Sequence, residues 1–156
     1  MIDTELPPGV LDDVSLAFPA LKRKLGGMLD TASAMLDEIR SDHSDKAIMM
    51  DLERQMNAGL VSIREIYARL PAVDERHMED MNQILDFAIR IERCGDVFSG
   101  RLQEIRDFQA QSGFRFSNEG QTEISGLVDA VRDAILLAHD AIWTGSVVTA
   151  ERLVRH

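Results

Sequence analysis

Two pairs of oxygen-bearing side chains recur at the same spacing along the chain. Glu53 and Asn57 form one pair, and Glu92 and Asp96 form the other. Residues four apart lie on one face of a helix, so each pair presents two oxygen donors together. Carboxylates held close together favour a bound cation or a proton. Oxygen-rich clusters suit hard divalent ions such as Mg²⁺, Ca²⁺ and Mn²⁺, or iron.

A solvated helix surface is the alternative interpretation of these pairs. Asn57 supplies an oxygen but no charge, which weakens the attraction for a cation. A further acidic pair, Asp129 and Asp133, with Asp140 beyond it, lies away from the apolar stripe of its helix. We interpret these three residues as a solvated face.

Other kinds of active site find little support. The histidines are scattered, and Asp74-Glu75-Arg76-His77 resembles only one of the two Glu-x-x-His copies that a di-iron bundle needs. Gly26-Gly27 lies in a helical pattern and lacks the flanking residues of a phosphate-binding loop. Ser62 and Ser99 have no histidine near them in sequence. Nothing in these residues therefore suggests nucleophilic catalysis.

The elements that position these residues are four long helices. Each carries apolar residues at alternating spacings of three and four, which form one stripe on a helix. Stripes this long favour nearly parallel helix axes, so the sequence predicts an all-α antiparallel bundle. The stripes comprise Phe18, Leu21, Leu25, Met28, Ala32, Met35 and Ile39; Met49, Leu52, Met56, Gly59, Ile63, Ile66 and Leu70; Met81, Ile84, Ala88, Ile91, Gly95, Phe98, Leu102 and Ile105; and Ile124, Leu127, Val131, Ala134, Ala138 and Ala141.

The breaks between the helices have local signals. Residues 41–45 form a polar turn, and Pro71 ends the second helix. Asp74 is the predicted N-cap of the third helix, and Ser117 caps the fourth after a loop over 112–117. Gly145 ends the fourth helix, and a fifth begins at Val147.

The two candidate pairs share a position relative to these stripes. Glu92 and Asp96 each directly follow a stripe residue of the third helix, and Glu53 and Asn57 do the same on the second. If the two helices pack antiparallel, we expect the pairs to converge across the groove between them.

Composition limits the partners. The chain of 156 residues has 27 acidic and 17 basic side chains, for a net charge of −10. This charge disfavours nucleic acid and anionic membrane surfaces. Its apolar runs are far shorter than the roughly 20 residues of a membrane-spanning helix. One cysteine, Cys94, allows no intrachain disulfide, so we expect a cytoplasmic location, or the cytoplasmic part of an inner-membrane protein.

The stretch Arg90–Asp96, Arg-Ile-Glu-Arg-Cys-Gly-Asp, resembles the PhoU family, whose third helix carries a segment close to Asp-Leu-Glu-Arg-Ile-Gly-Asp. Glu92 and Asp96 match the acidic positions of that family element. Glu53 and Asn57 lie where the family repeats the element on its second helix. Asn57 and Arg90 depart from the family pattern.

The resemblance is closer to the PhoU-like region that follows the membrane part of bacterial Na⁺/phosphate cotransporters. Residues 16–24 resemble the segment that leads into its first helix. Residues 116–119 resemble the Phe-Ser start of its fourth helix. Residues 144–154 resemble the turn into its fifth, so the likeness covers nearly the whole chain.

The resemblance implies a fold and a domain organisation. Residues 10–111 are expected to form a PhoU-like three-helix bundle. Residues 117–156 are expected to begin an incomplete second repeat that packs on the first unit or on a partner chain. We expect the chain to be a piece of a longer protein and to form a homodimer or a helix-swapped assembly.

The resemblance also implies a function. Such regions are non-catalytic modules that regulate phosphate transport through contacts with a membrane transporter domain or a phosphate-signalling protein. They can bind a divalent metal or an iron cluster, here on Glu53, Asn57, Glu92 and Asp96. The alternative is a purely structural interaction or oligomerisation domain with a decayed metal site.

Overall fold

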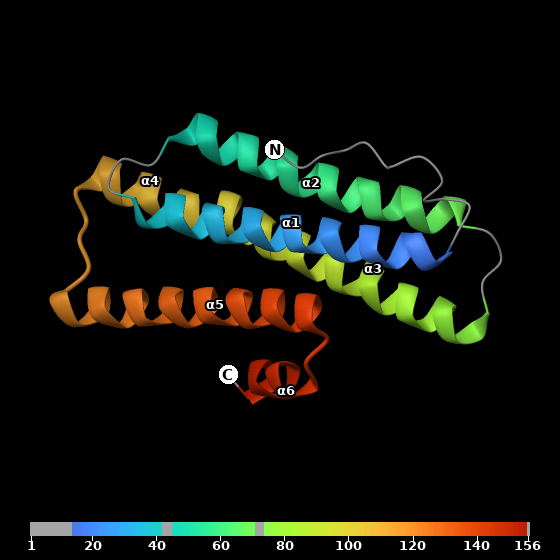
Figure 1. The fold of residues 1–156 in the computed structure, drawn as a ribbon. Helices are drawn as coiled ribbons and strands as arrows, with labels where there is room; N and C mark the ends of the chain where they lie inside the picture. Colours follow the sequence, from blue (N-terminus) through green and yellow to red (C-terminus); the bar gives the residue numbers. More distant parts are fainter. Residues whose placement is uncertain (1–13, 42–44, 71–73, 156) are drawn as a thin grey trace.

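The computed structural model describes residues 14–41, 45–70 and 74–155. All regular structure in these ranges is helical, which confirms the all-α prediction (Figure 1). The elements are α1 (Val14–Arg40), α2 (Lys46–Arg69), α3 (Glu75–Asp96), η1 (Val97–Leu102), α4 (Gln103–Ser112), α5 (Asn118–Thr144) and α6 (Val147–Arg155).

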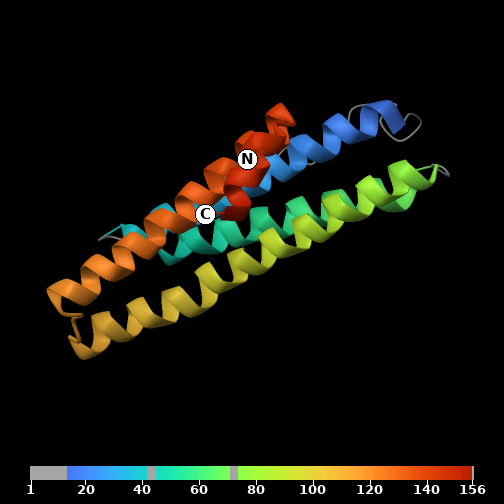
Figure 2. The same ribbon diagram turned by 90° about the horizontal axis from the view of Figure 1, so that it is seen from below.

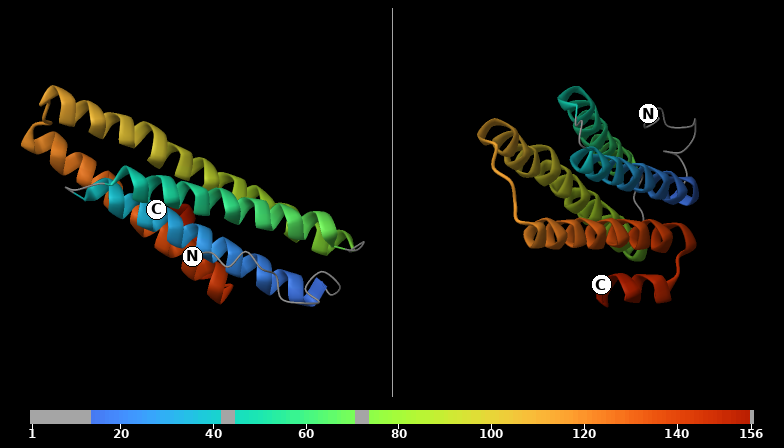
Figure 3. Two further views of the ribbon diagram at one scale, coloured as in Figure 1. Left: turned by 90° about the horizontal axis from the view of Figure 1, so that it is seen from above. Right: turned by 90° about the vertical axis from the view of Figure 1, so that its left-hand side faces the viewer.

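The first three helices form an antiparallel unit around α1. Helix α2 runs opposite to α1 and α3, and η1 and α4 continue the line of α3 (Figure 1). Helix α5 packs along α1, and α6 folds back against α5. Helices α4 and α5 are joined at one end of the molecule and diverge toward the other (Figure 2). Helix α6 is the outermost element, on the far side of α5 from α2 (Figure 3).

The core lies where α1, α2 and α3 meet. It consists of aliphatic, alanine and methionine side chains, and each large one contributes about 1.5–3 kcal/mol by its burial. The predicted stripes of these helices are largely buried. The core members include Leu21, Leu25, Met28, Ala32, Met35, Met49, Met56, Ile63, Ile66, Met81, Ala88, Ile91 and Phe98.

The helix ends follow the local signals in the sequence. Asp74 and Ser117 each accept a hydrogen bond from a backbone N–H of the helix that they precede, as predicted. Gly145 ends α5 with a φ of 64°, a left-handed conformation that favours glycine. The predicted polar turn at 41–45 separates α1 from α2, although its residues 42–44 lie outside the described residues. Pro71 and residues 10–13 of the predicted first domain also lie outside them.

The stripe predicted for the third helix is wrong at its end. Helix α3 passes into α4 through the π-helical turn η1, whose i→i+5 hydrogen bonds hold more residues per turn than an α-helix. The residues after η1 are therefore rotated about the helix axis by about one residue, or about 100°, from the positions that an unbroken α-helix would give them. As a result Ile105 is 47% exposed, although it was predicted to continue the stripe.

The same rotation turns Arg106 toward the end of α1. Its guanidinium donates hydrogen bonds to the backbone carbonyls of Glu38, Ile39 and Ser41. The last carbonyls of a helix lack partners within the helix, so Arg106 satisfies the C-terminus of α1. Its positive charge also suits the negative end of the helix dipole.

The stripe predicted for α5 is wrong in part. Val131 and Ala138 pack on the core as expected, but Leu127 is 66% exposed. Val128 and Ile135 pack on the core instead. Helix α5 carries two neighbouring apolar stripes about 100° apart, and only its contact with α1 selects between them.

Ion pairs join α5 to α1. Asp37 accepts from Arg132, and Arg40 donates to Asp129. Asp129, Asp133 and Asp140 are exposed, as predicted for a solvated face, and the carboxylate of Asp129 in addition pairs with Arg40 of α1. No helix in the described part of the chain is both long and apolar enough to span a membrane.

Candidate functional site

The candidate residues flank a close contact between α2 and α3. A β-carbon at Gly95 would lie 3.2 Å from Cγ of Met56 and 3.6 Å from Sδ of Met35. Glycine at this position lets α3 approach both neighbouring helices. Because α2 and α3 are antiparallel, the residues that directly follow Gly95 and Met56 turn to the same side of the helix pair.

This geometry brings Asp96 and Asn57 level with each other. Glu53 lies one turn before Asn57 on α2, and Glu92 lies one turn before Asp96 on α3. On antiparallel helices these displacements have opposite directions, each of about 6 Å. The order along the α2–α3 contact is therefore Glu53, then Asn57 with Asp96, then Glu92.

The convergence of the four candidate side chains stays a prediction, and helix geometry favours it most for the central pair, Asn57 and Asp96. Among the described residues, no three His, Cys, Asp or Glu side chains gather closely enough to hold a metal ion. Asn57 and Asp96 are exposed, whereas Glu53 and Glu92 are half-buried. The oxygen donors match a hard divalent cation in type, and the metal site stays a prediction.

The turn η1 begins directly after Asp96. Helix α2 contacts η1, and Glu53 lies on the part of α2 that is level with it. Single π-helical turns inside α-helices often occur at functional sites. The pattern of apolar residues gave no warning of this turn, because its stripe continues without a break through Phe98 and Leu102.

Arg90 and Cys94 are the residues of α3 nearest in sequence to the candidate pair Glu92 and Asp96 whose charge or pKa the structure informs. Arg90, which departs from the family pattern, donates from Nε to Oδ2 of Asp86 at 2.8 Å and so pairs along its own helix. Partial burial raises the pKa of the Cys94 thiol. The predicted donors are the carboxylate and amide oxygens of Glu53, Asn57, Glu92 and Asp96, and the thiol is not among them.

Known proteins are similar to this chain over almost its whole length. A Salmonella typhimurium protein named "Putative inorganic phosphate export protein YjbB" is 26% identical over 166 residues, which cover 99% of this chain and 30% of that protein. Proteins of the same name from Escherichia coli O157:H7 and K12 are 22% identical over 165 residues. The chain therefore spans less than a third of the length of these relatives. No family model and no solved structure matches it.

Proposed function

We propose that this chain is a non-catalytic module of a protein that moves inorganic phosphate across a membrane. The observation that carries the proposal is the similarity over 99% of the chain to proteins named for phosphate export. The likeness of Glu92 and Asp96 to the PhoU element supports the same role. Coupling to Na⁺ follows from the cotransporter resemblance alone.

The partner we propose is a membrane transporter domain, on its cytoplasmic side. The relatives are more than three times as long as the matched region, which leaves room for such a domain in the same protein. A separate phosphate-signalling protein is the second candidate partner. In either case the module would act by contact, because the sides of its long helices form an extended surface on which a partner can dock.

We propose further that a divalent metal ion binds at the groove between α2 and α3. Asp96 and Asn57 would supply the central oxygens, with Glu53 and Glu92 on either side. A bound cation supplies positive charge that offsets the mutual repulsion of the carboxylates. The ion would thereby stabilise the contact of α2 with α3 and the groove that a partner meets.

The alternative function is a structural interaction domain that has lost its metal. The absence of a three-residue metal cluster from the described ranges favours it. So does an exposed aromatic cluster at the end of the bundle. There Phe114 packs edge-on against Phe116, with ring centroids 5.4 Å apart, and it also contacts Phe108.

Phosphate efflux from cells tests the regulatory role. The full-length transporter would be compared with a version that lacks residues 14–155. We expect the shortened protein to transport phosphate without adjusting its rate to the cellular phosphate level. Unchanged transport and unchanged adjustment would overturn the proposal.

Elemental analysis separates the two candidate functions. One metal ion per chain, lost in Asp96→Ala but kept in Asp86→Ala, would support the metal-bearing module. Asp86 is a matched control because it is an exposed aspartate of the same helix outside the groove. A chain that stays metal-free after reconstitution with Fe²⁺ and Mn²⁺ would support the structural alternative.

A further inference from the structure

Four pairs of residues face each other along the contact of α1 with α5. Along the two helices the pairs advance by equal steps in opposite directions, so one antiparallel register places them all. Two pairs join arginine to aspartate and are charged at neutral pH, whereas a third joins histidine to aspartate and is charged on both sides only when the imidazole is protonated. The pairs are Arg40 with Asp129, Asp37 with Arg132, Asp30 with His139, and Gly26 with Trp143.

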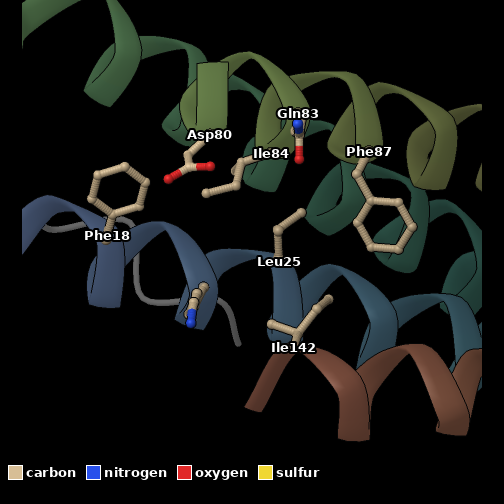
Figure 4. A pocket seen from close by; sticks show the side chains of 8 residues that line it. Phe18, Leu25, Asp80, Gln83, Ile84, Phe87 and Ile142 are labelled. Carbon is tan, nitrogen blue, oxygen red and sulfur yellow. The ribbon is translucent and has the colours of Figure 1, made fainter. Parts of the chain in front are cut away.

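The last two pairs lie where the C-terminal end of α5 meets α1. Ile142 of α5 packs on the core there and lines a hollow between α1 and α3 together with Leu25 (Figure 4). Its neighbour Trp143 lies beside Gly26, and α5 ends at the next residue before the turn into α6. A change of contact at His139 therefore acts on the end of α5 from which α6 continues.

The Nε2 atom of His139 has two neighbours that require opposite protonation states. The indole Nε1–H of Trp143 donates to it at 3.1 Å, so this nitrogen carries no proton and a neutral ring holds its proton on Nδ1. Oδ1 of Asp30 lies 3.4 Å from the same nitrogen, and a carboxylate can pair with it only when the nitrogen carries a proton. The two contacts therefore exclude each other.

Helix α1 brings three further charged groups to the side that faces α5. Asp37 lies two helical turns from Asp30 and pairs with Arg132. Lys22 and Arg23 precede Asp30 by about two turns in the other direction, and both are exposed. The carboxylate of Asp30 is thus the charged group of α1 that lies at contact distance from the imidazole.

Helix α6 and α5 itself hold the remaining charged groups near this place. Asp140 follows His139 directly, and its Oδ2 accepts from the hydroxyl of Thr149 on α6 at 3.1 Å. Asp133 precedes His139 by almost two turns and is exposed. The charged residues of α6 are Glu151 and Arg155, which pair with each other, and the exposed Arg152.

We propose that His139, Trp143 and Asp30 form a pH-responsive contact between α5 and α1. In its neutral state the imidazole accepts from the indole, a bond within α5. When Nε2 takes up a proton from solvent it becomes a donor, the indole bond is lost, and the imidazolium pairs with Asp30. Histidine changes charge between about pH 5 and 8, a range in which aspartate is ordinarily ionised.

The exchange replaces a bond within one helix by a bond between two helices. On the acid side three charge pairs join α1 to α5, and the third of them lies next to the turn into α6. On the alkaline side the two arginine pairs remain, and the indole holds the imidazole. None of the candidate metal residues takes part, so this contact stands or falls independently of the proposed metal site.

Nuclear magnetic resonance of the whole chain tests the exchange, because Trp143 is its single tryptophan. A hydrogen bond deshields the proton that it uses, so we expect the indole N–H proton to move upfield in one transition from about pH 8 to about pH 5.5. Nitrogen-15 spectra of wild type should show the His139 proton on Nδ1 at the higher pH and protons on both ring nitrogens at the lower pH. This second measurement depends on no variant.

Two histidine variants assign the transition. In His139→Gln the indole resonance should not respond to pH over this range, because glutamine does not titrate. His77→Gln is the matched control, since Nδ1 of His77 lies 2.8 Å from Oδ1 of Asp74 and so also faces an aspartate, but far from Trp143 in the sequence. The control should retain the wild-type transition, and circular dichroism should show equal helix content in both variants.

Double-mutant cycles of the unfolding free energy test the two partners. Coupling of His139→Ala with Asp30→Asn should be present at about pH 5.5 and lost at about pH 8, and coupling of His139→Ala with Trp143→Phe should show the opposite order. Four results would each overturn the proposal: an indole transition that persists in His139→Gln, its loss in His77→Gln, a neutral His139 with its proton on Nε2, or equal coupling to Asp30 at both pH values.

Discussion

Gly26 on α1 lies against the indole of Trp143 on α5, so that a β-carbon at Gly26 would come within 3.2 Å of the indole Nε1. That Nε1 donates to Nε2 of His139 at 3.1 Å, and the same His139 nitrogen lies 3.4 Å from Oδ1 of Asp30. The absence of a side chain at Gly26 thus allows the C-terminal half of α5 to approach α1 closely.

A large residue at this contact should destabilise the fold. We expect Gly26→Leu to lower the free energy of unfolding by about 1–3 kcal/mol, because overpacking outweighs the gain in helix propensity. Gly126→Leu is the control, since a β-carbon at Gly126 meets nothing within 4 Å. Urea denaturation of the two variants measures the difference. Equal stability would mean that Trp143 does not depend on the space at Gly26.

The paired ion contacts between α1 and α5 should show coupling. Asp37 and Arg132 form one contact, and Arg40 and Asp129 form its counterpart, from an Asp-x-x-Arg segment on each helix. Arg132→Glu should destabilise the chain, and Asp37→Arg added to it should recover part of the loss. Exposed pairs contribute about 0.2–1 kcal/mol each. A double-mutant cycle measures this coupling by urea denaturation. If the changes in unfolding free energy of the two single variants simply added in the double variant, the contact would be contradicted.

Acid should weaken the contact of α4 with α2. Hydrogen bonds from Lys46, whose Nζ lies 2.6 Å from Oδ2, and from Gln103 lower the pKa of Asp107. A carboxyl with a lowered folded pKa stabilises the protein above its ordinary pKa of 3.8, and the effect is lost as pH falls through the folded value.

Substitution at Asp107 should remove this dependence. We expect Asp107→Asn to be less stable than wild type near neutral pH and equally stable in strong acid. Lys46→Met should reproduce the loss, since it removes the strongest hydrogen-bond donor to Asp107. Thermal unfolding followed across the acid range measures both curves, and parallel curves would contradict the prediction.

The thiol of Cys94 should react slowly despite its exposed position. Partial burial raises its pKa, which reduces the thiolate fraction at neutral pH. We expect alkylation by iodoacetamide to be slower than that of a free cysteine peptide at pH 7. The difference should shrink as the pH rises above the pKa of the peptide thiol. A faster reaction than the peptide would indicate a nearby positive charge instead.

Metal should stabilise the α2–α3 contact if the proposed site binds it. A divalent ion at 100 times its Kd would raise the free energy of unfolding by about 2.7 kcal/mol. Asp96→Ala should abolish this increase, whereas Asp86→Ala should retain it. Thermal shift with Mn²⁺ and Fe²⁺ measures the effect. An increase that survives in Asp96→Ala would place the ion elsewhere.

Local chemistry explains which parts of the fold could be predicted. The caps Asp74 and Ser117 and the end at Gly145 depend on a few neighbouring residues, and each was predicted correctly. The buried stripes of the first two helices follow from the spacing of their apolar residues, which can be read from the sequence alone. These features decide where helices begin and end and which face is buried.

Contacts between helices explain what could not be predicted. The exposure of Ile105 depends on η1, a change of hydrogen-bond pattern that leaves the apolar spacing intact. The choice between two stripes on α5 depends on its position against α1. In the candidate site, the close approach of Gly95 to Met56 sets the register of α2 against α3, and the sequence does not record that register.

The π-helical turn η1 has a consequence for sequence length. It holds about one residue more than a regular helix over the same rise, so deleting one residue there would keep both flanking helices intact. Such a deletion would rotate α4 by about 100°, bury Ile105 and withdraw Arg106 from the end of α1. A relative that is one residue shorter between Val97 and Leu102 would therefore keep the α2–α3 contact at Gly95 but present a different surface on α4.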